Sequence, residues 1–170
     1  MTRRQFIRRG AILCCHCIRN IAFYLSGWHD TKPVFKGQFW VNANGNFLDI
    51  SVLEWCKLFG EKRGKHRWGK LITNGEIFFN ELLKSLGMNT EQWEAYIKEM
   101  RSYRDRFITH LDLEERMQIP KLNIALKSTI FLYDYLLAHE DEGDFFIDAP
   151  DSALAFYTRF INEGKLVYGT

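Results

Sequence analysis

The sequence has little of what disordered or membrane-spanning chains contain. Only 3 of its 170 residues are proline, and no serine- or glutamine-rich tract occurs, which leaves little room for disorder. No run of about 20 apolar residues is present, so we expect no transmembrane helix and no membrane partner. A glycine-rich phosphate-binding loop, an H-E-x-x-H motif and a G-x-S-x-G motif are also missing. These absences leave kinase, zinc-protease and α/β-hydrolase functions without support.

Cysteine is scarce as well, and three of the four cysteines lie too close together to staple a fold: Cys14, Cys15, Cys17 and Cys56. A reduced, cytoplasmic protein is therefore expected. The run Cys14-Cys15-His16-Cys17 is similar to a metal-binding cluster. However, adjacent helical residues point in different directions, and no second ligand pair follows at a suitable spacing. We predict helical core cysteines, with no metal and no cofactor.

The N-terminal stretch from Thr2 to Arg8, TRRQFIR, is similar to a twin-arginine export signal. Arg19 and Asn20 interrupt any longer apolar run, and no small-x-small cleavage site follows. The apolar residues also keep the spacing of a mature core helix: Phe6, Leu13, Cys14, Cys17, Ile18, Ile21 and Leu25. We therefore expect a helix over residues 3–26 rather than a removed signal.

Hydrophobic residues make up 46% of the chain and aromatic residues 15%, which favours one ordered domain over residues 1–170, with a small second lobe as the alternative. The net charge of +2 is too near neutral for a general nucleic-acid binder. The charges are nevertheless segregated. The basic residues gather at Lys57, Lys62, Arg63, Lys65, Arg67 and Lys70, and the acidic ones at Glu140, Asp141, Glu142, Asp144, Asp148 and Asp151.

The basic segment is a candidate for binding a polyanion on one face of the molecule. Within it, Lys65, His66, Arg67 and Trp68 are the residue types that hold phosphates and stack on bases, so they are predicted RNA-binding residues. The alternative is a pair of solvated loops, basic and acidic, with the basic loop packed by its single Trp68.

Apolar spacing predicts helices and no strand pair with a hairpin turn. The second helix covers 47–59, or starts earlier near Gln38 unless Asn44-Gly45-Asn46 forms a turn. Residues 28–37 read as a connection, and 60–69 as a basic loop. The other helices are expected over 3–26, 76–86 (ended by Gly87), 90–112, from Pro120 through Leu137, and 152–162. The predicted fold is an all-α bundle of four longer helices with short additional helices.

The stretch from Thr90 to Asp112 is predicted as one helix capped by Thr90. Its apolar stripe consists of Trp93, Tyr96, Ile97, Met100, Phe107 and Leu111. Arg104 falls inside this stripe, and His110 lies at its edge in line with Tyr103. A cation on an apolar face is costly unless something pairs with it. Such a break in the pattern tends to mark a functional or strained site.

Arg104 and His110 together suit metal-free cleavage of RNA, in which the substrate's own 2′-hydroxyl attacks the neighbouring phosphorus. A guanidinium can hold a phosphate, and an imidazole can exchange protons near neutral pH. Six residues of helix place the two side chains roughly 120° apart around the axis. Convergence therefore needs a partner's copy of the helix, a distorted helix end, or both.

These residues resemble the motif of the HEPN superfamily, which is an Arg, a polar residue, a short spacer and then a His. Arg104-Asp105-x4-His110 matches that pattern, and YRDRFITHLD is similar to its abortive-infection and toxin-type members. The stretch 53–60, LEWCKLFG, followed by Trp68, also resembles a helix of that bacterial branch. Pro120 before the next long helix fits too. The resemblance covers the chain from about Phe39 to Tyr135.

The resemblance implies an all-α HEPN-like fold, a homodimer that packs two motif helices together, and metal-independent endoribonuclease activity. By position, Arg104 would stabilise the phosphate, His110 would transfer a proton, and Asp105 would orient them. Tyr103, one heptad before His110, is a further candidate neighbour of the site. Such a protein would act as a toxin or in phage defence, with RNA as substrate and an antitoxin protein as a further partner.

A non-catalytic dimeric module of the same fold is the alternative. In that case Arg104 forms an interhelical salt bridge with a Glu or Asp, and His110 faces the helix dipole at a C-terminus. The two functions predict different surroundings for the arginine. An enzyme should place Arg104 and His110 beside a cleft that solvent reaches, whereas a structural module should bury Arg104 against a carboxylate.

Overall fold

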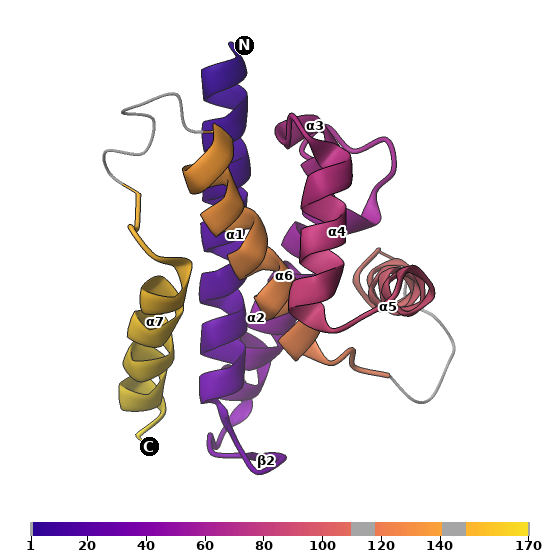
Figure 1. Ribbon diagram of the computed structural model, residues 1–170. Coiled ribbons are helices and arrows are strands. Elements are labelled where there is room, and N and C mark those ends of the chain that lie inside the picture. Colours follow the sequence, from indigo (N-terminus) through magenta and orange to yellow (C-terminus); the bar gives the residue numbers. More distant parts are fainter. Residues whose placement is uncertain (1, 110–117, 141–148, 170) are drawn as a thin grey trace.

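The computed structural model describes residues 2–109, 118–140 and 149–169, and it is mostly helical (Figure 1). The predicted all-α class is therefore confirmed. Within the described ranges, no helix is both long and apolar enough to cross a membrane. In chain order the elements, with η for π-helix, are α1 (Arg3–Ser26), β1 (Trp28–His29), β2 (Lys32–Pro33), α2 (Gln38–Trp55), η1 (Cys56–Gly60), α3 (Trp68–Leu71), α4 (Gly75–Leu86), α5 (Thr90–Tyr103), η2 (Arg104–Thr109), α6 (Leu122–Tyr135), η3 (Leu136–Glu140) and α7 (Ala153–Tyr168).

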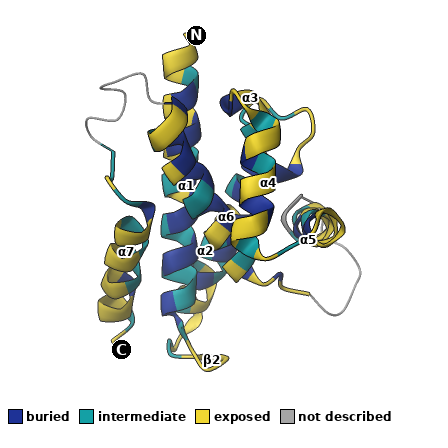
Figure 2. Ribbon diagram, in the orientation of Figure 1, coloured by how far each residue is buried: buried dark blue, intermediate teal, exposed yellow. Residues whose placement is uncertain are grey.

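Helix α1 is the element around which the bundle is built, because α2, α6 and α7 all pack against it (Figure 1). A capping box closes its start: the Thr2 hydroxyl accepts from the Gln5 N–H, and the Gln5 side chain accepts from the Thr2 N–H. Figure 2 shows buried residues along most of the helix. They recur at helical spacing: Ile7, Ala11, Cys14, Cys17, Ile18, Ile21 and Ala22. The predicted helix over 3–26 is confirmed.

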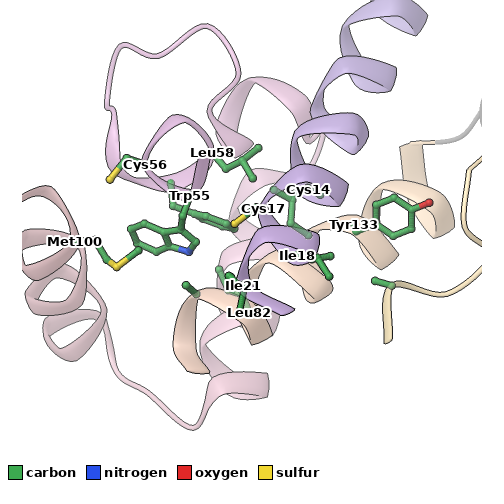
Figure 3. Packing of buried hydrophobic residues seen from close by; sticks show 14 of the residues in the cluster. Cys14, Cys17, Ile18, Ile21, Trp55, Cys56, Leu58, Leu82, Met100 and Tyr133 are labelled. Atoms are coloured by element: carbon green, nitrogen blue, oxygen red, sulfur yellow. The ribbon is translucent and has the colours of Figure 1, made fainter. Parts of the chain in front are cut away.

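Trp55, the last residue of α2, lies in the middle of the aromatic part of the core. Its ring packs against Phe59 and against Trp93 and Tyr96 of α5, with centroids 5.2–5.7 Å apart. Its indole N–H donates to the Ser128 hydroxyl at 2.9 Å, so the one polar atom of the ring is satisfied. Figure 3 shows Trp55 together with Met100, Cys17 and the other labelled core residues. This cluster joins α2, α5 and α6.

Helix α2 begins at Gln38, the earlier of the two predicted starts, and Asn44-Gly45-Asn46 forms no turn. The reason lies in the buried Asn44 side chain. Its oxygen accepts from the Trp28 indole N–H at 2.9 Å, and its amide donates to the Tyr24 carbonyl and the Tyr168 hydroxyl. In turns, an asparagine side chain commonly hydrogen-bonds to its own backbone. Here Asn44 instead links α2 to the end of α1 and to α7.

The connection after α1 contains a short antiparallel hairpin, so the prediction of no hairpin is wrong. Trp28 pairs with Pro33, and His29 pairs with Lys32. The two turn residues, Asp30 and Thr31, both have positive φ, at 44° and 68°. Asn-Gly or Asp-Gly is the usual signature of such a turn. Asp-Thr lacks the glycine, and each strand has only two residues, so the pattern gave no signal.

Three helix boundaries differ from the predicted ones. Asn89, not Thr90, caps α5, because its side chain accepts from the Gln92 N–H in a capping box. Pro120 precedes α6, whose N-cap is Lys121. The final helix starts at Ala153, with Ser152 as its N-cap, and continues to Tyr168 rather than ending at Asn162. Helix α4 ends at Gly87, whose φ of 64° is the left-handed conformation expected there.

Glu140, at the end of η3, is buried, so its predicted place in a solvated acidic loop is wrong. It accepts from the Arg3 guanidinium at 2.9 Å and from the N–H and hydroxyl of Thr73 at 2.6 and 2.7 Å. Arg3 also donates to the Lys70 and Leu71 carbonyls. The first arginine of the twin-arginine-like motif therefore fastens the start of α1 to two other segments. Four more acidic residues of that region, Asp141, Glu142, Asp144 and Asp148, lie outside the described residues.

We predict that Glu140→Gln lowers the free energy of unfolding by about 1.5–3 kcal/mol, because hydrogen bonds to a charged group are lost and the new amide faces donors. Chemical denaturation followed by circular dichroism measures the change. Glu163→Gln, on an exposed turn of α7, is the control and should leave stability nearly unchanged. Equal stability of the two variants would contradict the role assigned to Glu140.

A second prediction concerns the close approach of α7 to α1 at Gly164. A Cβ added there would lie 2.1 Å from Ser26 Oγ and 2.8 Å from Ser26 Cβ, and rotating the serine relieves only the first contact. Gly164→Ala should therefore destabilise the fold by about 1–3 kcal/mol. Gly45→Ala, in α2 with nothing within 4 Å, should instead stabilise it by about 0.5–1 kcal/mol. Thermal unfolding of both variants measures the difference in sign, and a shared sign would refute the packing argument.

Candidate functional site

Arg104 lies where α5 changes into the π-helix η2, so the predicted single helix is regular only to Tyr103. The apolar stripe is confirmed up to that point, since Trp93, Tyr96 and Met100 are all buried. A π-helix bonds i to i+5 and inserts an extra residue into the turn, which changes the direction of the side chains that follow. The Arg104 side chain is nevertheless largely covered, as expected for a residue within the apolar stripe, because only 14% of it is exposed.

Two carboxylates hold the Arg104 guanidinium. Its Nε donates to Asp105 Oδ1 at 2.8 Å, and its Nη1 donates to Glu61 Oε1 at 3.1 Å. Glu61 directly follows η1, so the pair joins the end of one π-helix to the start of another. Burial opposes the charge, but the hydrogen bond that Arg104 donates to Asp105 and the negative charges of Asp105 and Glu61 raise the pKa of Arg104 above its ordinary value. The guanidinium is therefore positively charged at neutral pH.

The nearby thiol of Cys56 adds no negative charge. Burial raises its pKa to about 12 although Arg104 acts in the opposite direction, so the group stays protonated at neutral pH. Burial also raises the pKa of Cys15 to about 11 and of Cys17 to about 12. All four cysteines are free, and Cys14, Cys17 and Cys56 are buried. The prediction of helical core cysteines is confirmed for Cys14 and Cys17, whereas Cys15 is only half-buried.

An open cleft of about 360 Å³ adjoins the arginine. Asp105 forms part of its wall. The remaining lining residues come from the basic segment and from α5: Lys62, Glu94, Ile97, Lys98, Arg101 and Ser102. Arg104 is thus covered and paired with carboxylates, as the structural alternative predicts, and an open cleft begins at one of those carboxylates. The enzyme prediction also requires His110 beside the cleft, and that residue lies outside the described ranges.

His110 lies outside the described residues, as do Leu111 and Asp112. The structure therefore gives no position for the predicted proton-transfer residue relative to Arg104. It does contain a distorted helix end, which the sequence identified as one route to convergence, because residues 104–109 are π-helical.

Tyr103, the predicted neighbour of the site, is a buried anchor beside Arg104. Its hydroxyl donates to Asp49 Oδ1 at 2.8 Å and so fastens α5 to α2. Burial raises the pKa of Asp49, and burial together with Asp49 raises that of Tyr103. The tyrosine therefore stays protonated. Tyr103 fixes the start of η2 more directly than it could act on a substrate.

The predicted RNA-binding residues Lys65, His66, Arg67 and Trp68 are brought beside the start of α1 and the end of α2. The His66 ring stacks on Phe6 at 5.8 Å. Burial and the charges of Arg9, Lys57 and Lys65 lower the pKa of His66, so its imidazole is neutral at pH 7. Arg9, which the sequence did not assign to this surface, thereby joins it together with Lys57 of the basic segment.

Trp68 is oriented toward the core rather than toward solvent. Its ring stacks on Phe79 at 5.7 Å with an interplanar angle of 4°, and it contacts Phe78 at 5.0 Å. Arg67 lies over the same ring at 5.4 Å. This packing corresponds to the alternative in which one Trp anchors the basic loop.

The residue that sequence reasoning missed is Glu61. A carboxylate partner for Arg104 was expected in the structural alternative, but no residue could be named. One signal was available, because Glu61 is the single acidic residue among the basic ones between Lys57 and Lys70. Asp49 was also missed. Its signal was weaker, because it is one of two charged residues in a largely apolar helix.

No metal site emerges from these side chains. In the part of the chain that the structure describes, no three His, Cys, Asp or Glu residues lie close enough together to hold an ion. Comparison of the chain with protein-family models, with curated proteins and with solved structures found no match. The function of the chain is therefore inferred from its own residues and their geometry.

Proposed function

We propose that the chain is a metal-independent endoribonuclease of the HEPN type, acting as a cytoplasmic toxin or phage-defence protein. One observation supports this most: a charged Arg104, fixed by Asp105 at a π-helical distortion, next to a cleft that contains three cationic side chains. Distorted π-helical turns occur frequently at functional sites. The all-α fold and the Arg104-Asp105-x4-His110 motif agree with the HEPN resemblance.

The proposed reaction needs a phosphate-binding cation and a proton-transfer group, and no metal. The 2′-hydroxyl of the substrate attacks the adjacent phosphorus and loses its proton, and the bond from phosphorus to the 5′-oxygen breaks. A 2′,3′-cyclic phosphate and a 5′-hydroxyl end result. Arg104 stabilises the negative charge that builds up on the phosphate oxygens, and His110 transfers a proton. Asp105 keeps the guanidinium in one orientation through its Nε.

A homodimer is part of the proposal. Arg104 and His110 are six residues apart, so a regular helix would separate them by roughly 120° around its axis. Packing two copies of the motif helix together supplies a second arginine and a second histidine to one cleft. An antitoxin protein that covers this cleft is the corresponding partner of a toxin.

A non-catalytic dimeric module of the same fold is the second candidate, and the ion pair between Arg104 and Glu61 favours it. A guanidinium that is 14% exposed and held by two carboxylates is the arrangement of a structural bridge. In this candidate Arg104 fixes η2 against η1 and shapes the dimer surface, and RNA is not cleaved.

RNA cleavage by the purified protein in EDTA tests the first candidate. The wild type should cut, and Arg104→Ala and His110→Ala should each lower the rate by at least roughly 100-fold, as expected when a charge-stabilising or proton-transferring group is lost. Arg159→Ala and His29→Ala, which change exposed residues on α7 and in the hairpin, are matched controls and should cut like the wild type.

The oligomeric state of each variant is measured by light scattering. An inactive wild type, or equal cleavage by all four variants, would refute the ribonuclease function. Loss of the dimer in Arg104→Ala, with no cleavage by the wild type, would establish the module instead.

Glu61→Gln separates the two candidates by the sign of its effect. In the enzyme, the phosphate competes with Glu61 for Arg104, so removing the charge should raise the cleavage rate at limiting RNA. An ion pair this exposed is worth about 1 kcal/mol or less, which corresponds to at most about a fivefold gain. Glu163→Gln is the matched control. A cleavage rate that falls along with thermal stability would assign Glu61 a structural role only.

A further inference from the structure

The cleft beside Arg104 is lined by three cationic side chains. Lys62 comes from the segment after η1, and Lys98 and Arg101 come from α5. All three residues are exposed. Among residues 2–109, 118–140 and 149–169, the structure gives none of them an ion pair.

The helical spacing explains why these groups share one surface. Lys98, Arg101 and Ser102 are related by three and four residues, so they lie on one face of α5. Ile97, half-buried, forms an apolar part of the same lining. The cleft therefore offers charge, a hydroxyl donor and a small apolar contact within about 360 Å³.

Two segments of the chain connect the cleft with Arg104. Asp105 lines the cleft and also accepts from Arg104 Nε. On the other side, Lys62 is the neighbour of Glu61, which accepts from Arg104 Nη1. An anion bound between Lys62 and Arg101 would thus lie close to the two carboxylates that hold the guanidinium of Arg104.

Two carboxylates in the lining limit which anions can bind. Asp105 is already engaged with Arg104, so Glu94 is the negative charge that an anion would meet in addition. With three positive and two negative side chains in its lining, the cleft has a small net positive charge. That balance fits a phosphodiester, with one charge spread over two oxygens, better than a compact multivalent anion.

We propose that this cleft binds a backbone phosphate of single-stranded RNA next to the phosphate that is cleaved. The inference rests on the proposed ribonuclease function and adds the path of the substrate: the strand runs from Arg104 into the cleft along α5. Lys62, Lys98 and Arg101 bind the phosphate, Ser102 donates a hydrogen bond to it, and Ile97 contacts the sugar. Because phosphate contacts carry no base information, this site adds affinity without sequence preference.

Binding of a non-cleavable strand tests the proposal independently of catalysis. The probe is a fluorescein-labelled oligomer of 2′-O-methyl uridine, which lacks the attacking hydroxyl, and fluorescence anisotropy measures its dissociation constant. Lys62→Ala, Lys98→Ala and Arg101→Ala should each weaken binding, and the triple variant should weaken it roughly fivefold at about 0.1 M salt, since one phosphate contact on a single strand contributes a slope of about 0.7 in log K against log salt. In the triple variant the slope itself should decrease by about 0.7.

Two further variants serve as controls. Lys84→Ala removes an exposed lysine from α4, outside the cleft, and should bind like the wild type. Glu94→Gln removes a repulsive charge from the cleft and should bind more tightly. All of these side chains are exposed, so circular dichroism should show unchanged folding in every variant.

Equal affinity of the three cleft variants, the wild type and Lys84→Ala would overturn the proposal. So would tight, cleft-dependent binding of oligo-glutamate by a protein that does not bind the oligouridine, because the cleft would then be a site for an acidic protein segment. If the wild type fails to cleave RNA in EDTA but the cleft variants still lose affinity, the phosphate site stands and only the catalytic proposal fails.

Discussion

The burial of α1 on several sides is the constraint on which the rest of the structure depends. The helix packs against α2, α6 and α7, and its buried row of small and branched side chains includes two cysteines. Small residues let the neighbours come close. A Cβ on Gly10 would lie 2.6 Å from a methyl carbon of Leu71, and one on Gly164 would meet Ser26. These contacts fix where α3 and α7 lie, and through Arg3 the start of α1 also fixes the end of η3.

The three π-helices have a common arrangement, and it determines where the charged side chains lie. Each one continues an α-helix at its C-terminal end: η1 after α2, η2 after α5, and η3 after α6. Their ends carry Glu61, Arg104 and Glu140, which form the long-range ion pairs among the described residues. The residue inserted in a π-helix rotates the side chains that follow it around the helix axis. A polar side chain can therefore lie where the apolar stripe would otherwise continue, and it can pair with a residue distant in the chain. The core helices thus keep their apolar faces and still end in polar contacts.

The sequence was sufficient to predict the features that depend on periodicity. The helices around Cys17, Leu82, Met100 and Leu132 bury one apolar face each, and a 3.6-residue period reveals such faces directly. Arg104 was recognisable for the same reason, as a cation inside an apolar stripe. Glu61, Asn44 and Glu140 were not, because their roles depend on partners 43, 124 and 137 residues away in the chain. Local pattern contains no information on such distances, and each of these residues also has an ordinary explanation as a loop or turn former.

The state in which the structure holds Arg104 bears on how a site of this kind could work. A buried, unpaired guanidinium would be costly, so under the proposed function the free protein needs a carboxylate beside Arg104 until a phosphate binds. The two carboxylates differ in how easily they can release the guanidinium. Asp105 is adjacent in sequence and bonds to Nε, so it can orient the group throughout a reaction. Glu61 is 45% exposed and can turn into solvent at little cost, because ion pairs at such positions contribute about 1 kcal/mol or less. An exchangeable glutamate beside a fixed aspartate keeps the arginine charged and oriented in both states, which a purely structural bridge does not require.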